Sequence, residues 1–294
     1  MRLPKIDIGD DIASLQKKAI EDLRNDEEVY RVIHDDLHLS NSQVKESLAT
    51  LLDYQDDVHY CANCPGYDLC AKTNPHFEMG LELDEGYLKR NYSPCRVVRK
   101  FEELEKRFFV RDFPVEWRDK DFRSIDKTAQ RKQAIVEMMK ICRTNSGDWV
   151  YLTGKNGSGK SYILAMFANT YSALHPGCAF CDTSALVDKL KDLQINSKNE
   201  FDERFKALCS CPLLVLDDFG NEFKTDFVFS SILFPILNAR AKANLPTAFS
   251  SDFSLIEIES MYRLKVGAAR ARQLKDLILA RCKVEFDVTG LPVY

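Results

Sequence analysis

One eight-residue segment constrains the fold of this chain more than any other feature. Residues 154–161 read Gly-Lys-Asn-Gly-Ser-Gly-Lys-Ser, which is the pattern of a phosphate-binding P-loop. Residues 148–153 before it are typical of a short buried strand, and residues 162–169 after it are typical of a helix. A P-loop requires a strand, the loop and a helix in this order. The segment therefore predicts an α/β domain that holds a nucleotide by its phosphates.

The spacing within the P-loop gives each residue type a role. Glycines let backbone N–H groups turn toward a phosphate, and the N-terminus of the following helix adds partial positive charge. Lys160 is expected to reach the β- and γ-phosphates, and the hydroxyl of Ser161 is expected to hold Mg²⁺. The alternative is a glycine-rich turn that binds nothing. The predicted ATP-binding residues are Gly154, Lys155, Asn156, Gly157, Ser158, Gly159, Lys160 and Ser161.

A second segment supplies carboxylates. Residues 212–218 read Pro-Leu-Leu-Val-Leu-Asp-Asp, the Walker B arrangement of an apolar run that ends in two acids. A buried parallel strand delivers such acids at its C-terminal end, where ligands of open α/β sheets bind. We expect Asp217 to hold the Mg²⁺ shell and Asp218 to orient or activate the attacking water. With Lys160 they form the predicted catalytic set of an ATPase; the alternative is a strand that ends in a solvated turn.

Strand-like and helix-like segments alternate through the second half of the chain, which predicts a central parallel sheet. Cys178 and Cys181 have the spacing of a metal-binding pair, but they fall in a strand-like segment and are expected to be small buried side chains. The expected strands are 179–182, 245–253 and an edge strand 284–288. The expected helices are 128–143, 183–190, 201–208, 227–243 and one last helix that carries Arg263, Arg270, Arg272 and Arg281.

Residues 11–58 are expected to be helical because their apolar side chains recur at three- and four-residue spacing. The segment Ser40-Asn41-Ser42 supplies a capping signal, with Glu46 a turn later. Residues 1–60 hold 14 acidic and 7 basic side chains. This segment is either a helical bundle with a solvated acidic surface or a module that docks a protein partner. For the second case, the candidate contact is the apolar stripe around Val29, Val32, Ile33 and Leu37.

Cysteines cluster in the polar segment that follows. Cys61 and Cys64 are separated by two residues, the spacing at which two thiolates bind one metal ion. Structural zinc takes four Cys or His ligands, and five candidates compete for the four places. We expect Cys61, Cys64 and Cys95 to bind, with His76 as the fourth ligand and Cys70 as its competitor. Zinc would stabilise a short segment that has little core.

Composition and length set the wider limits. The chain has 294 residues, 45% apolar and 29% charged, as in ordinary soluble globular proteins. No apolar run approaches the length of about 18 residues that indicates a membrane span, and residues 1–7 lack the apolar core of a signal peptide. We therefore expect a cytoplasmic protein. A charged helical run, 96–111, leads to the expected division into an N-terminal domain 1–105, a linker 106–120 and an ATPase domain 121–294.

Several segments together resemble the AAA+ helicase loaders of bacteria, the DnaC/DnaI family. The double aspartate with a following glycine and glutamate stands as Asp217, Asp218, Gly220 and Glu222. A Leu-Pro-Thr-x-Phe-x-Ser stretch stands at 245–251, and the order of Cys61, Cys64, His76 and Cys95 is similar to the family's zinc segment. The resemblance implies an AAA+ domain behind a small helical zinc-binding domain.

The function that the resemblance implies is a loader that binds the hexameric replicative helicase and delivers it onto single-stranded DNA at initiation or restart of replication. It also implies Mg²⁺ and Zn²⁺, self-assembly on ATP, and weak hydrolysis that DNA or a partner stimulates. Two features depart from the family. Asp252 stands where the family has Asn, and Arg270, Arg272 and Arg281 all compete for the trans-acting arginine. The alternatives are a transposition-helper AAA+ ATPase, a small-molecule P-loop kinase and a scaffold that does not hydrolyse its nucleotide.

Overall fold

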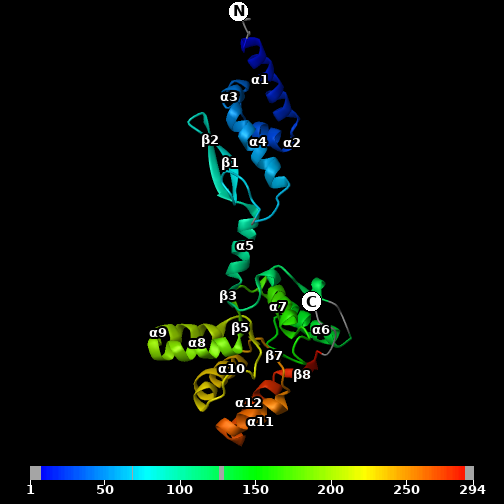
Figure 1. Cartoon of the computed structure of the whole chain (residues 1–294), viewed down its shortest axis with the longest axis vertical. Coiled ribbons are helices and arrows are strands. Elements are labelled where there is room, and N and C mark those ends of the chain that lie inside the picture. Colours follow the sequence, from blue (N-terminus) through cyan, green and yellow to red (C-terminus); the bar gives the residue numbers. More distant parts are fainter. Residues whose placement is uncertain (1–7, 68, 126–128, 289–294) are drawn as a thin grey trace, which may run out of the picture. The chain divides into compact units, whose positions relative to one another are not determined.

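The computed structural model describes residues 8–67, 69–125 and 129–288 (Figure 1). It divides into two compact units, one that ends at Glu103 and one that begins at Leu104. Residues 1–7, from which the absence of a signal peptide was predicted, lie outside the described residues, as does residue 128 at the start of a predicted helix. None of the helices in the described ranges is long and apolar enough to cross a membrane.

The first unit begins with helices and continues as a hairpin. The helices are α1 (Ile8–Asn25), α2 (Glu27–Arg31), the π-helical turn η1 (Val32–Asp36), α3 (Asn41–Glu46) and α4 (Leu48–Ala62), and the strands are β1 (Phe77–Asp84) and β2 (Tyr87–Pro94), followed by α5 (Arg96–Lys106). The predicted helical character of 11–58 is confirmed. Leu23, Val29 and Leu51 are almost fully buried in the core of this unit, and Met79 of β1 packs into the same core.

Local hydrogen bonds explain where these helices begin. The side chain of Asp26 accepts from the N–H of Val29 at the start of α2. Ser40 caps α3, as predicted, and Gln43 completes the capping box by accepting from the backbone N–H of Ser40. Glu46 is not part of this box; its carboxylate accepts from the hydroxyl of Ser42 at 3.0 Å.

Three strands of the chain were not expected from the sequence: the two strands of a hairpin and one strand that follows α5. The antiparallel hairpin β1–β2 turns at Glu85 and Gly86, which both have positive φ. The predicted helix 96–111 is wrong at its C-terminal end, because α5 ends at Lys106 and Phe108 begins the strand β3. β3 pairs in parallel with a strand of the second unit's sheet, and this pairing competes with continuation of the helix.

A six-stranded sheet in the order β3-β5-β6-β7-β4-β8 forms the centre of the second unit. All neighbouring strands are parallel, as predicted, and β8 lies at an edge. The strands are β3 (Phe108–Arg111), β4 (Trp149–Thr153), β5 (Cys178–Asp182), β6 (Leu214–Asp217), β7 (Thr247–Ser251) and β8 (Cys282–Asp287). The helices of this unit are α6 (Ala129–Thr144), α7 (Lys160–Ser172), α8 (Thr183–Asn196), α9 (Lys198–Ser210), α10 (Phe234–Lys242), α11 (Leu255–Val266) and α12 (Ala268–Leu279), with shorter turns η2 (Val115–Trp117), η3 (Phe122–Ser124) and η4 (Val228–Leu233).

Helices cover both faces of this sheet. Alternate residues of the central strands enter different cores. In β4, Trp149 and Tyr151 join one core, and Val150 and Leu152 join the other. Helices α6 and α7 contribute to the second core, whereas α8 to α12 contribute to the first (Figure 1). Such strands are apolar on both faces, which is why their sequences read as continuous apolar runs.

Because side chains alternate between the two faces of the sheet, Cys178 and Cys181 do not form a metal-binding pair. Both side chains are fully buried, but Cys178 belongs to one core and Cys181 to the other. Burial raises the pKa of the Cys178 thiol to about 12, so it stays protonated. Two thiols on opposite faces of a sheet do not share a metal ion, and both act as small core side chains.

The predicted single last helix is wrong. Gly267, at a φ of 86°, separates α11 from α12, and a residue without a side chain adopts this conformation most readily. Arg263 therefore lies in α11 and Arg270 in α12, while Arg281 follows α12.

Candidate functional site

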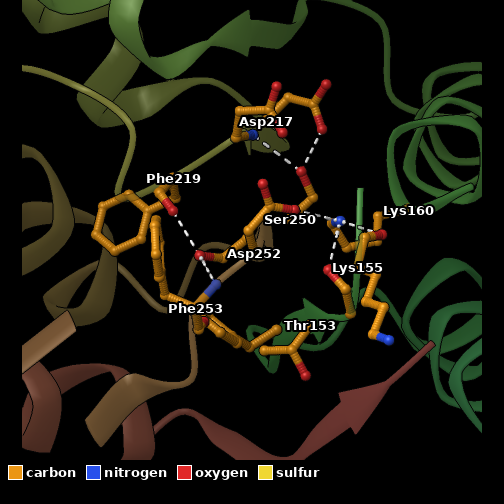
Figure 2. Close-up of polar contacts among 12 residues, drawn as sticks. Thr153, Lys155, Lys160, Asp217, Phe219, Ser250, Asp252 and Phe253 are labelled. Carbon is orange, nitrogen blue, oxygen red and sulfur yellow. Dashed lines mark hydrogen bonds and ion pairs between the residues drawn. The ribbon is translucent and has the colours of Figure 1, made fainter. Parts of the chain in front are cut away.

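The strand order brings the predicted site residues to one edge of the sheet. β7 lies between β6 and β4, so the carboxyl ends of these three strands are neighbours. The end of β4 leads into the P-loop, the end of β6 carries Asp217, and the end of β7 leads to Asp252. Figure 2 shows Lys160, Asp217, Ser250 and Asp252 directed toward a common centre.

Backbone geometry fixes the P-loop. Gly154 has a φ of 146°, and a Cβ atom there would lie 2.8 Å from the carbonyl oxygen of Val288, so a side chain does not fit. The helix α7 begins at Lys160, with Gly159 in the left-handed conformation as its N-cap. Arg131 of α6 donates to the carbonyl oxygen of Ser158 at 3.0 Å and so attaches the loop to the neighbouring helix. The free N–H groups of the first turn of a helix suit a phosphate.

Lys160 is buried and held on three sides. Its side chain is 5% exposed. Its ammonium donates to the carbonyl oxygens of Gly154 and Lys155 at 2.8 and 3.2 Å, and to the carboxylate of Asp252 at 2.7 Å (Figure 2). The P-loop lysine thus lies beside Asp252, the residue that stands where the family that this chain resembles has Asn.

Asp217 lies where two hydroxyl groups meet. The hydroxyl of Ser250 donates to its carboxylate and accepts from the backbone N–H of Asp218 at 2.9 Å, and the nearby hydroxyl of Ser161 acts to lower the pKa of Asp217. Burial, as the largest cause, raises the pKa of Asp217 to about 6. The two predicted Mg²⁺ ligands, the hydroxyl of Ser161 and the carboxylate of Asp217, therefore lie near each other. Oxygen donors of this kind suit Mg²⁺.

Asp218 occupies a strained position at the end of the strand. Its φ of 54° is left-handed, a conformation that Asp adopts more readily than most residues. Burial raises the pKa of its carboxyl group, and the nearby charge of Asp252 raises it further. The backbone N–H of the next residue, Phe219, donates to the carbonyl oxygen of Ser250 at 2.8 Å. These bonds hold the loop after β6 against β7.

Sequence reasoning missed Ser250 and the connections of Glu222. Ser250 lies in the buried strand β7, and no local signal indicates that its hydroxyl bonds to the carboxylate of Asp217 and the backbone N–H of Asp218. Glu222 is 2% exposed; it accepts from the backbone N–H of Gly220 at 2.7 Å and from the hydroxyl of Tyr262 at 2.6 Å. This buried carboxylate attaches the loop after β6 to α11. In the sequence, only the resemblance to the helicase loaders indicated that Glu222 is important.

The three candidate arginines have different surroundings. Arg270 forms an ion pair with Asp226 and lies over the ring of Phe229. Arg281 donates to the side chain of Asn244 and to the carbonyl oxygen of Ala241. Arg272 has 69% of its side chain exposed, with Glu259 at 4.0 Å. The assignment of a trans-acting arginine among them stays a prediction.

The candidate zinc ligands lie together in the first unit. All five, namely Cys61, Cys64, Cys70, His76 and Cys95, line one cavity of about 20 Å³. Within the described ranges, however, no group of three or more His, Cys, Asp or Glu side chains has the arrangement of a metal site. Lys72 lies against Cys61, with 3.3 Å between Nζ and Sγ, and forms an ion pair with Asp57. The Cys and His side chains are of the types that bind zinc, but their positions in the described residues are not those of a zinc site.

The fold and the strand-end motifs define a P-loop domain of the α/β class with a central parallel sheet. No protein-family model matches the chain. It is 24% identical over 229 residues to the replicative helicase loader DnaI of Bacillus subtilis, an alignment that covers 75% of this chain and 73% of DnaI.

Two crystal structures are each similar to about two thirds of the chain. One, described as a primosome component from Streptococcus pyogenes serotype M3, has a TM-score of 0.54 and 25% identity over 66% of this chain and 98% of its own. The other, of DnaI, has a TM-score of 0.55 and 24% identity over 62% of this chain and 98% of its own, and it supports the fold. The chain is therefore DnaI-like, which confirms the resemblance predicted from the sequence.

Proposed function

We propose that this chain is a helicase loader, an ATP-dependent protein that binds the replicative DNA helicase and delivers it onto single-stranded DNA. The observation that carries the proposal is the alignment with DnaI, which spans about three quarters of both chains. DnaI is a replicative helicase loader by name, and this chain takes the same role in the proposal. We place that role in the cytoplasm, where the chromosome is replicated.

The second unit supplies the nucleotide switch in this proposal. Lys160 binds the β- and γ-phosphates, the N-terminus of α7 supports them, and Ser161 with Asp217 holds Mg²⁺. Asp218 orients the attacking water. The proximity of Ser161 to Asp217 and the burial of Lys160 support these assignments. Hydrolysis is expected to be weak in the isolated chain, since a neighbouring subunit would supply an arginine.

In this proposal the N-terminal part binds the helicase. All of the nucleotide motifs lie after residue 150, and residues 1–60 carry a net negative charge. The predicted contact face around Val29 is wrong, because Val29 and Ile33 are buried in the core of the first unit. Tyr30, on the helix α2, is 40% exposed and lies beside Glu27 and Glu28. An exposed aromatic side chain in an acidic setting is a suitable contact for a partner. The proposed limits are 1–105 for the helicase-binding domain, 106–120 for the linker and 121–294 for the ATPase domain; the linker contributes the strand β3 to the sheet of the ATPase domain.

We also propose that the N-terminal domain holds one zinc ion through Cys61, Cys64, Cys95 and either His76 or Cys70. The shared cavity lined by these side chains supports the proposal. Zinc would supply structural stability and no chemistry at this position. Elemental analysis of protein purified without chelator is expected to give one zinc per chain; its absence would contradict this assignment.

The experiment that tests the proposed function is a pull-down of the full chain with the replicative helicase of its own organism. The wild type is expected to retain the helicase, with and without ATP. The charge-reversal pair Glu27→Lys and Glu28→Lys changes the proposed contact surface and is expected to reduce retention. The matched control Asp188→Lys and Asp192→Lys makes the same charge change on α8 of the other unit. Retention that falls only in the control pair would reverse the assignment of the two units.

A further inference from the structure

All three N–H donors of Lys160 have acceptors within the protein. Two are backbone carbonyl oxygens of the P-loop, from Gly154 and Lys155, and the third is the carboxylate of Asp252 at 2.7 Å. An ammonium group has three donors and no more. A phosphate that binds Lys160 must therefore compete with at least one of these acceptors. Because the lysine is 5% exposed, water screens its ion pair less than that of a surface pair.

Asp252 differs from the other two acceptors because it carries a negative charge. It follows β7, the strand between the P-loop strand β4 and the Walker B strand β6. Its carboxylate contacts Lys160, and Asp217 lies on the other side of Ser250, which donates to it (Figure 2). A terminal phosphate that approaches the Walker B residues meets the carboxylate of Asp252 as well as the lysine.

We propose that Asp252 is a specificity-determining residue that weakens the binding of a nucleoside triphosphate relative to a diphosphate. It does so by competing for Lys160 and by repelling the terminal phosphate. The inference rests on the proposed nucleotide site and adds to it a preference between two classes of ligand. A partner that draws Asp252 away from Lys160 would raise triphosphate affinity.

The preference for a diphosphate follows from the position of the γ-phosphate, which carries the additional charge of a triphosphate. A P-loop lysine reaches both the β- and γ-phosphates. A diphosphate ends at the β-phosphate, so Lys160 can bind it while keeping its contact with Asp252. The γ-phosphate extends toward the strand ends that carry Asp218 and Asp252, and brings its additional charge close to both carboxylates.

The test compares two substitutions in the full chain, Asp252→Ala and Asp252→Asn. Dissociation constants for ADP and for a non-hydrolysable ATP analogue are measured by calorimetry, with Mg²⁺ and with EDTA. Both substitutions are expected to strengthen binding of the analogue by about tenfold relative to ADP, the scale expected for removal of one nearby unit charge. The control Asp188→Asn removes an equal charge from an exposed side chain of α8 and is expected to leave the ratio unchanged.

Other results would overturn the proposal. An unchanged ratio in both variants would show that Asp252 does not discriminate. A gain in Asp252→Asn alone would assign the effect to a new amide donor instead of the lost charge. Weaker analogue binding in both variants, in Mg²⁺ only, would make Asp252 a metal-binding group. If the wild type binds neither nucleotide, the proposed nucleotide site itself fails, and this result is distinct from an unchanged ratio.

Discussion

Replacement of Asp217 by Asn is expected to reduce the pH dependence of stability and to weaken nucleotide binding. Burial raises the pKa of Asp217 from 3.8 to about 6. Such a group gives stability that is complete below the unfolded pKa and is lost as the pH rises through the folded pKa. The loss is about 1.5 kcal/mol at pH 5 and about 3 kcal/mol at pH 8. Asn has nearly the same shape and no charge, so it avoids this loss.

The assay is urea unfolding in Mg²⁺-free buffer at pH 5 and pH 8. Between these pH values the wild type is expected to lose about 1.5 kcal/mol more unfolding free energy than Asp217→Asn. Asp188→Asn, whose exposed carboxylate forms only a surface pair, is expected to follow the wild type. Equal pH dependence of the wild type and Asp217→Asn would refute the reasoning that burial penalises this carboxylate.

The same variant separates stability from ligand binding. Asp217→Asn is expected to weaken nucleotide binding in Mg²⁺ and to leave binding in EDTA unchanged, because only the metal contact is lost. Calorimetric titration of both proteins under both conditions measures this difference. Equal weakening with and without Mg²⁺ would assign Asp217 a role other than holding the metal ion.

Three further predictions follow from particular contacts. Tyr262→Phe removes the hydroxyl that donates to the buried carboxylate of Glu222 and is expected to lower the unfolding free energy by about 1.5–3 kcal/mol in urea titrations; no change would mean that this hydrogen bond does not hold α11. Gly154→Ala places a Cβ atom against the carbonyl oxygen of Val288, so calorimetry is expected to show at least tenfold weaker nucleotide binding; wild-type affinity would contradict this. Cys64→Ser is expected to lose the zinc and to lower the thermal stability of the first unit, as chelation of the wild type should; an unchanged melting curve would exclude a structural metal.

The nucleotide motifs could be predicted from the sequence because their information is local. The P-loop glycines, Lys160 and the acids at 217 and 218 each lie beside an apolar run that forms a buried strand. Fully buried parallel strands are apolar on both faces, so they are evident without knowledge of their neighbours. The predicted alternation of strands and helices then fixes the class of fold.

The contacts within the site could not be predicted because they depend on strand order. The bonds from Ser250 to the Walker B residues and from Lys160 to Asp252 join residues far apart in the chain. The hairpin β1–β2 was missed for another reason. Its strands are largely exposed and charged, and its turn, Glu85-Gly86, lacks the Asn-Gly or Asp-Gly signal that marks most such turns.

Loading of the replicative helicase onto a circular single-stranded DNA is the direct test of the proposed function. A closed circle has no end, so a ring-shaped helicase must be opened to enclose it. Helicase is expected to co-elute with labelled circular DNA in gel filtration when the wild-type chain and ATP are present. Omission of the chain, or its replacement by Lys160→Ala, is expected to abolish co-elution. Equal co-elution of helicase with the circle in the absence of the chain, or with Lys160→Ala, would contradict the claim that this protein is an ATP-dependent helicase loader.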